Sequence, residues 1–292
     1  MTARRVPFFS CVIPAYNRAP YLAQAIESAL MQDVPASERE IIVVDDGSTD
    51  ATSEVLRRYA GRIRIFRQRR QGQGAAYRRA VAFARGEIVA GLDSDDVWLP
   101  SKLSRVAQAF EKRGDVVAVA HGVKFVDARL RPLKFQPAWR VPEDRILDLN
   151  RDSILQYSPA GQVLYGSVLF TTGSAWAVKR AAVVGKNRSL RLRFPAEPIW
   201  PEQWIMLAAA AAGGSAVRLG DALSLYRRHE NNESRYPAHT VEDKILLRKY
   251  SERLASRALQ FLDCAPRRAL AHDLRTMARR YAAEILLLEA RR

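Results

Sequence analysis

Cysteine and histidine are scarce in this sequence, and each shortage excludes a class of site. The two cysteines, Cys11 and Cys264, lie far apart, which excludes a disulfide scaffold and a zinc site made of cysteines alone and suits a reducing compartment. The four histidines show neither HExxH nor HxxxH spacing, so a zinc hydrolase is disfavoured.

Long apolar runs are also missing. The longest strongly apolar stretch, residues 204–212, is too short to cross a bilayer. The first ten residues contain Arg4 and Arg5 but no apolar stretch before Pro14, so no secretory signal is predicted. We therefore expect a cytoplasmic protein, with the inner face of the membrane as the alternative location.

Acidic residues are few relative to basic ones: 31 Asp and Glu stand against 47 Lys and Arg, for a net charge of +16. A field of this sign attracts phosphate groups of a nucleotide, a nucleic acid or an anionic membrane, and charge alone does not choose among them. With 48% hydrophobic and 27% charged residues, the 292-residue chain has the composition of a folded protein with one large domain or two modest ones.

The first hundred residues alternate between buried strands and helices. Strands are predicted from short apolar runs at residues 8–13, 40–44, 63–66 and 87–92. Helices are predicted between them at residues 21–31, from 49 or 50 to 59, and 74–84. This order is typical of an α/β fold with a mostly parallel sheet, flanking helices and right-handed crossovers.

The alternation is looser beyond residue 97. Further strands are predicted at residues 116–120 and 167–170, and a helix at residues 202–212, with irregular chain over 126–165. From residue 241 the pattern turns helical to residue 292, with a break at 264–266.

Three polar clusters, at residues 14–17, 45–48 and 93–96, follow predicted strands. Because ligands of such sheets bind at the carboxyl ends of the strands, the three clusters are expected to converge on one site. No GxGxxG follows the first strand and no GxxxxGK[ST] occurs, which disfavours a dinucleotide-binding site and a P-loop.

The cluster Asp93-Ser94-Asp95-Asp96 offers hard oxygen ligands of the kind that suit Mg²⁺ or Mn²⁺ bridging to nucleotide phosphates. The alternative is a charged turn in which Asp95 or Asp96 caps the next helix, and the position after a buried strand favours the metal site. In the second cluster, Asp45 could accept hydrogen bonds from a base or a ribose, and the alternative is again a turn with a helix cap.

Four motifs, in this order, resemble those of family 2 glycosyltransferases of the GT-A fold. They are CVIPAYNR from residue 11, EIIVVDDGSTDAT from residue 40, QGQGAAYRRAVAFARGE from residue 71 and GLDSDDVWLPSKL from residue 91. LYRRHENNES from residue 225 is similar to a YRxHxxNxS segment of many members. The resemblance implies a GT-A domain over residues 1–240, with a nucleotide-binding half at about 8–103 and an acceptor half at about 104–240, and a C-terminal helical extension over 241–292.

The resemblance implies inverting transfer of a sugar from a nucleotide-diphosphate sugar to an acceptor hydroxyl in a single displacement. A UDP-sugar is the expected donor, and Mn²⁺ or Mg²⁺ the expected cofactor, which would neutralise charge on the leaving diphosphate. The expected acceptor is a glycan or a lipid-linked molecule of surface polysaccharide or glycolipid synthesis, with peripheral membrane association allowed and no nucleic acid expected.

Site residues are carried over by motif position. The resemblance implies a nucleotide pocket lined by Pro14, Ala15, Tyr16, Asn17, Asp45, Asp93 and Ser94. It assigns the metal to Asp95 and brings His229 to the metal or the diphosphate, with Arg227 or Arg228 nearby. From the residues alone, a lone histidine in a polar loop is more often solvated.

The general base is where this sequence departs from the family. Members carry a Glu-Asp pair at the start of the helix beyond the acceptor site, and the Asp takes the proton. Gln203 stands there when the position is counted from Phe194, whereas Glu202 does when it is counted back from residues 212–214. We predict Glu202 as the base, with Glu197 as the fallback. The alternative for Glu202 is a first-turn carboxylate that favours the helix dipole.

Other functions stay open from the sequence. Gln203 suggests a catalytically silent homologue that still binds sugar nucleotides. The charge of +16 suggests a nucleic-acid-binding protein, although no helix-turn-helix, zinc-finger or RRM signature occurs. A nucleotidyltransferase would need a Gly-rich, lysine-bearing loop near the N-terminus, which is absent.

Two groups of arginines are interpreted as solvated or packed faces, with an anionic lipid surface as the functional alternative. The first lies at the predicted third strand and the loop after it: Arg62, Arg64, Arg67, Arg69 and Arg70. The second lies in the C-terminal helices beside leucines: Arg267, Arg268, Arg275, Arg279 and Arg280, with Leu270, Leu274, Leu286 and Leu287.

Overall fold

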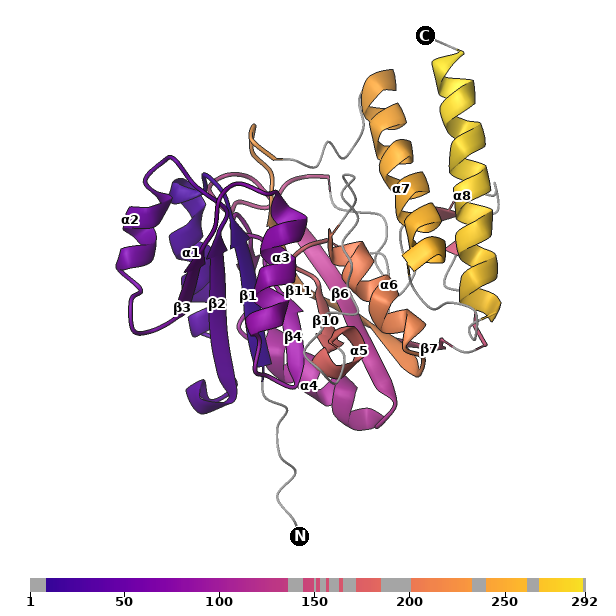
Figure 1. Ribbon diagram of the computed structural model, residues 1–292. Helices are drawn as coiled ribbons and strands as arrows, with labels where there is room; N and C mark the ends of the chain where they lie inside the picture. Colours follow the sequence, from indigo (N-terminus) through magenta and orange to yellow (C-terminus); the bar gives the residue numbers. More distant parts are fainter. Residues whose placement is uncertain are drawn as a thin grey trace.

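The centre of the computed structural model is a nine-stranded sheet in the order β3-β2-β1-β4-β10-β6-β11-β5, with β7 paired to β11 (Figure 1). The structure describes residues 9–135, 144–149, 151–152, 156–157, 163–164, 172–184, 201–232, 240–261 and 268–290. A separate two-stranded sheet joins β8 (Gln156–Tyr157) to β9 (Val163–Leu164).

The first half of the sheet is parallel, as predicted. It contains β1 (Phe9–Ala15), β2 (Arg39–Asp45), β3 (Arg64–Arg67) and β4 (Ile88–Gly91). The connections contain α1 (Ala19–Leu30), the short 3-10 helix η1 (Ala36–Glu38), α2 (Thr52–Arg57) and α3 (Gln73–Phe83). Every residue of β1 is buried, because helices cover both faces of the sheet.

The first strand extends two residues beyond the predicted end. Pro14 lies opposite Val44 and Ala15 opposite Asp45 in the pairing with β2. Pairing of β1 with β4 ends at Val12. On that side, no neighbouring strand therefore needs a backbone N–H from Pro14, which has none.

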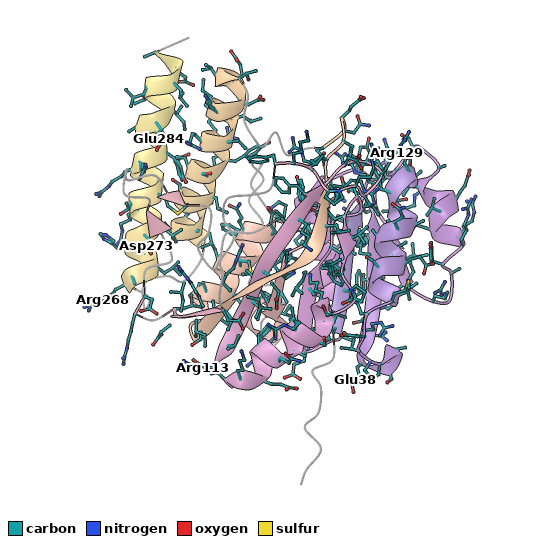
Figure 2. The ribbon with its side chains drawn as sticks, turned by 180° about the vertical axis from the view of Figure 1, so that it is seen from behind. Glu38, Arg113, Arg129, Arg268, Asp273 and Glu284 are labelled. Atoms are coloured by element: carbon teal, nitrogen blue, oxygen red, sulfur yellow. The ribbon has the colours of Figure 1, made fainter. Side chains whose placement is uncertain are left out.

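The second half of the sheet is mixed, with β10, β5 and β7 antiparallel to their neighbours. β10 (Trp176–Lys179) is antiparallel to both β4 and β6 (Val116–Val126), and β11 (Ser215–Arg227) is parallel to β6. The carboxyl ends of β1, β2, β3, β4, β6 and β11 therefore meet at one edge. Figure 2 labels Arg129, which follows β6, at that edge, and Glu38 and Arg113, which precede β2 and β6, at the opposite one.

Two edge strands complete the sheet and lie on β11: β5 (Val97–Trp98) and β7 (Arg145–Asp148). The predicted strand at 116–120 is confirmed but continues to Val126, and β11 had no predicted counterpart. β11 contains register shifts around Ala222, and Gly220 and Asp221 interrupt its apolar pattern. The predicted strand at 167–170 lies outside the described residues.

Helices form a layer on each face of the sheet. One apolar cluster contains residues of α1, α2 and α4 (Lys102–Lys112), together with one face of the strands. The other contains residues of α3, α5 (Arg180–Val183), α6 (Pro201–Ala211), α7 (Val241–Phe261) and α8 (Arg268–Glu289). The predicted helix at 202–212 and the two C-terminal helices are thus confirmed.

No described helix combines the length and the apolar character that crossing a membrane requires. The pair α7 and α8 lies side by side beyond α6, and its far end projects past the sheet (Figure 1).

Candidate active site

Three carboxylates gather just after β4, at the edge where the parallel strands end. Oxygen atoms of Asp93, Asp95 and Asp96 lie within 4.8 Å of one another, in a group that could hold a metal ion. Oδ1 of Asp93 accepts hydrogen bonds from the Tyr77 hydroxyl at 2.9 Å and from Nε2 of Gln73 at 3.0 Å. Helix α3, which carries both donors, therefore orients Asp93.

Asp95 lies between two basic side chains. Its Oδ2 atom is 3.1 Å from Nε of Arg18 and 3.2 Å from Nε2 of His229. Burial by itself would raise the pKa of Asp95, but the hydrogen bond with His229 and the charge of Arg18 outweigh it, and the pKa falls below the usual value. The His229 side chain is 4% exposed, so it is not the solvated loop histidine of the alternative interpretation.

Asp96 receives neutral donors instead. Its Oδ1 accepts from the backbone N–H of Arg227 at 2.8 Å, and its Oδ2 from the Ser174 hydroxyl at 2.6 Å. Burial, followed by the charges of Asp95 and Asp93, raises its pKa well above the usual value. The helix-cap interpretation of this cluster is wrong, because β5 follows Asp96 directly and α4 begins only at Lys102.

Ser174 connects the acidic cluster to the core beneath it. Its Oγ accepts from the backbone N–H of Asp93 at 2.9 Å while donating to Asp96. Its carbonyl accepts from Nε1 of Trp98 at 3.0 Å, from Nζ of Lys102 at 3.0 Å and from Oγ of Ser224 at 2.7 Å. Ser174, two residues before β10, thus joins the segments at the ends of β4, β5 and β11.

The first two polar clusters are hydrogen-bonded to each other. Asn17, in a left-handed conformation with φ of 51°, accepts from the backbone N–H of Thr49 at 2.9 Å through Oδ1. Asp45 is 1% exposed and accepts from the backbone N–H of Ser48 at 2.9 Å. The predicted convergence is therefore observed, and Pro14, Ala15 and Ser94 are buried within the same three segments.

Two arginines of the predicted solvated edge are exposed, with 62% and 45% of their side chains accessible, and also pair with carboxylates of the second cluster. Nε of Arg67 is 3.3 Å from Oδ2 of Asp45, and Nη1 of Arg70 is 3.2 Å from Oδ2 of Asp46. The Arg70 guanidinium also lies 3.4 Å from the ring centre of Tyr16. Arg67 lies opposite Asp45 in the pairing of β3 with β2, a proximity that no local sequence pattern indicates.

Glu202 is in the first turn of α6 and is 7% exposed, as is Gln203. Its charge contributes to raising the pKa of Tyr77, after burial and Asp93. The fallback residue Glu197 lies outside the described residues. Trp176 and Trp204 are fully buried and pack in the core.

Comparison with known proteins decides the family. The profile described as Glycosyl transferase family 2 matches residues 10–184, more than half of the chain. The chain belongs to this family. It is a glycosyltransferase, as the four motifs implied.

Relatives of the glycosyltransferase differ in how much of it they match. It is 33% identical over 247 residues to an uncharacterised glycosyltransferase of Nostoc sp. The matched region covers 80% of this chain and 69% of the relative. It is 40% identical over 114 residues to a chondroitin synthase of Escherichia coli, which covers 38% of this chain and only 16% of that longer protein.

Solved structures show that the fold is GT-A. TarS of S. aureus in complex with UDP-GlcNAc is similar with a TM-score of 0.65 and 21% identity, over 91% of this chain and 71% of that one. The mannosyltransferase PcManGT of Pyrobaculum calidifontis, in complex with GDP-Man and Mn²⁺, is similar with a TM-score of 0.61 and 21% identity, over 99% and 76%.

Proposed function

We propose that the glycosyltransferase moves a sugar from a nucleotide-diphosphate sugar, with a UDP-sugar as the donor class, to an acceptor hydroxyl by an inverting single displacement. The observation that carries the proposal is the convergence of the Asn17 and Asp45 loops with the carboxylates of Asp93, Asp95 and Asp96 at one sheet edge. The likeness to chondroitin synthases supports a carbohydrate acceptor in polysaccharide or glycolipid synthesis.

The acidic cluster fits a divalent cation. Its ligands are hard carboxylate oxygens, which suit Mn²⁺ or Mg²⁺. The raised pKa of Asp96 reflects its burial first and then the negative charges of Asp95 and Asp93, and a cation would offset these charges. Asp95 and His229 would hold the ion, which when bound would neutralise charge on the leaving diphosphate. PcManGT, which shares the fold, binds Mn²⁺.

The neighbouring segments would bind the nucleotide. Asp45, at the end of β2, would accept hydrogen bonds from the base, and Tyr16 and Asn17 would line the pocket beside it. Pro14 and Ala15 would form its floor at the end of β1, and Asp93 and Ser94 would contact the ribose. Arg70, which lies over the Tyr16 ring, adds a cation beside the phosphates.

Glu202 would take the acceptor's proton. Its carboxylate is buried in the first turn of α6, and its charge acts on Tyr77, which donates to Asp93 of the acidic cluster. Gln203 is equally buried, but its neutral amide cannot act as the general base. The alternative is a silent homologue that binds the donor without transfer, which the glutamine beside Glu202 suggests.

Calorimetric titration of UDP, dTDP and GDP and their sugars, with and without Mn²⁺, tests the donor side. We expect one nucleotide class to bind only with the metal. Asp95→Ala should abolish this metal-dependent binding while the circular dichroism spectrum stays unchanged. The matched control is Asp221→Ala, which removes a half-exposed carboxylate paired with Arg105. Equal binding with and without Mn²⁺ in the parent protein would refute the proposed metal assistance.

A further inference from the structure

The outer face of α8 carries one row of exposed residues that is basic along most of its length and apolar at its end. Arg268, His272, Arg275 and Arg279 recur at intervals of three or four residues and so share a face of the helix. Ala282, Leu286 and Leu287 continue the exposed face toward the C-terminal end. The leucines are 68% and 62% exposed, unlike Leu270 and Leu274, which face the core.

The positive charge of this row has no acidic counterpart on its own helix. Asp273 is buried on the opposite face. Glu284 pairs with Arg248 and Arg280, and Glu289 pairs with Lys249. Within the part of the chain that the structure describes, no carboxylate pairs with Arg268, Arg275 or Arg279. An anionic partner surface would therefore meet unopposed guanidinium groups.

The apolar end of the row projects on the side of the molecule where the parallel strands end. Figure 1 shows that the far end of the α7–α8 pair extends beyond that edge of the sheet. In Figure 2, Glu284 marks this end of α8, on the same side as Arg129, whereas Arg268 lies at the other end. A surface that receives Leu286 and Leu287 would thus also face the edge that carries the acidic cluster.

We propose that this row docks the protein onto an anionic phospholipid surface. Leu286 and Leu287 enter the boundary between headgroups and acyl chains, while Arg279 and Arg275 bind lipid phosphates. Leu286 lies seven positions after Arg279, a rise of about 10 Å along the helix, which separates the apolar end of the row from its basic part.

A lipid surface fits the row better than the other occupants do. A nucleic acid would use the arginines but leave the two leucines in water. A second copy of the chain would offer the arginines of this row no free carboxylate on α8, because Asp273, Glu284 and Glu289 are buried or paired. Docking by itself does not depend on the proposed function. Because the docked surface would face the acidic cluster, it would also present a lipid-linked acceptor to it, and this part of the inference rests on the proposed function.

Sedimentation with phosphatidylcholine vesicles, with and without phosphatidylglycerol, tests the docking. We expect the full chain to bind only the anionic vesicles and to release as salt is raised. Arg275→Gln/Arg279→Gln should weaken the partition about 30-fold, as expected for two arginines at such a surface. Leu286→Ser/Leu287→Ser should also release the protein. All four residues are exposed, so these variants should fold.

Matched controls keep the test specific. Arg57→Gln/Arg151→Gln removes two charges from side chains that are 72% and 86% exposed, and Met31→Ser removes an apolar side chain that is 71% exposed, all outside α8. Equal losses in these controls, or no binding of the parent protein, would overturn the proposal. So would a leucine variant that still binds vesicles but dissociates a dimer in sedimentation velocity. Nucleotide titration of the same variants reports on the proposed function separately, because a protein that binds vesicles but no nucleotide contradicts only the latter.

Discussion

Single side chains decide how the acidic cluster is charged. Asp95, held between Arg18 and His229, has a lowered pKa, whereas Asp96, one residue further on, has a strongly raised one because it is buried and lies near the charges of Asp95 and Asp93. The two neighbours thus differ in role: Asp95 remains an anion that can bind a cation, and Asp96 is anchored in the core by Ser174 and Arg227.

At the same scale, the base can be separated from its neighbour. Glu202→Gln should keep donor affinity and lower kcat about 10²- to 10⁴-fold, because it removes the only basic atom at the start of α6 while retaining size and hydrogen bonding. Steady-state transfer or donor-hydrolysis assays measure it. Gln203→Ala is the control and should leave kcat near that of the parent protein. Parental turnover in Glu202→Gln would move the base to another residue or favour the silent homologue.

Cys11 gives a prediction about stability and pH. Burial in β1 raises the pKa of its thiol from the ordinary 9.0 to about 12. Between these values the unfolded chain loses a proton that the folded protein keeps, so the free energy of unfolding should fall as the pH rises from about 9 to about 12. Cys11→Ala should show a shallower fall in urea titrations over this range. An unchanged slope would show that the thiol ionises while still folded.

Among the secondary-structure elements, the close approach of the segment before β10 to the end of β4 matters most for the site. Gly173 lies so near Asp93 that an added Cβ would be 2.1 Å from its Oδ2. Position 173 therefore requires glycine for this contact with Asp93. The sequence does not indicate the contact, because residues 93 and 173 are far apart along the chain.

Gly173→Ala should displace Asp93 and weaken metal-dependent nucleotide binding at least tenfold, with a stability loss of about 1–3 kcal/mol from overpacking. Calorimetric titration and thermal denaturation measure the two effects. Gly114→Ala is the matched control, since an added Cβ there meets nothing within 4 Å. Equal nucleotide binding in both variants would show that Asp93 moves aside without consequence.

At the scale of the whole molecule, the C-terminal helices belong to the same core as the sheet. Leu254 of α7 and Leu274 of α8 are fully buried in the cluster that contains Trp204 of α6 and Trp176 of β10. The division at residue 240 stays a prediction about where the family's domain ends. The two helices cover apolar residues of α6 and of the sheet that would otherwise be exposed to water.

Leu274→Ala should therefore lower the free energy of unfolding of the entire protein by about 2–5 kcal/mol. The tryptophans that the structure describes are Trp98 in β5, Trp176 in β10 and Trp204 in α6, so their fluorescence reports on the sheet and α6, while circular dichroism reports on all helices. The two signals should shift together on denaturation. The exposed Leu286→Ala is the control. A variant in which circular dichroism changes before fluorescence would show that α7 and α8 unfold independently.

Local patterns predicted the parallel half of the fold well because each signal there is short-range. Apolar runs and helical spacing lie within the elements that they predict. The positions of the three polar clusters were predictable for the same reason, since each follows its own strand. β11 was missed, because its pairing with β5, β6 and β7 stabilises a strand that its own pattern does not indicate.

By itself, the amino-acid sequence determined the family, the alternation of strands and helices, and the carboxylates that end β4, because these depend on neighbouring residues. Only the tertiary structure decided which charges meet. Arg18 and His229 reach Asp95 from opposite ends of the chain, and Arg67 and Arg70 reach Asp45 and Asp46 through the register of β2 and β3. Coulomb energies and burial depend on distances in space, and those distances exist only once the sheet has formed.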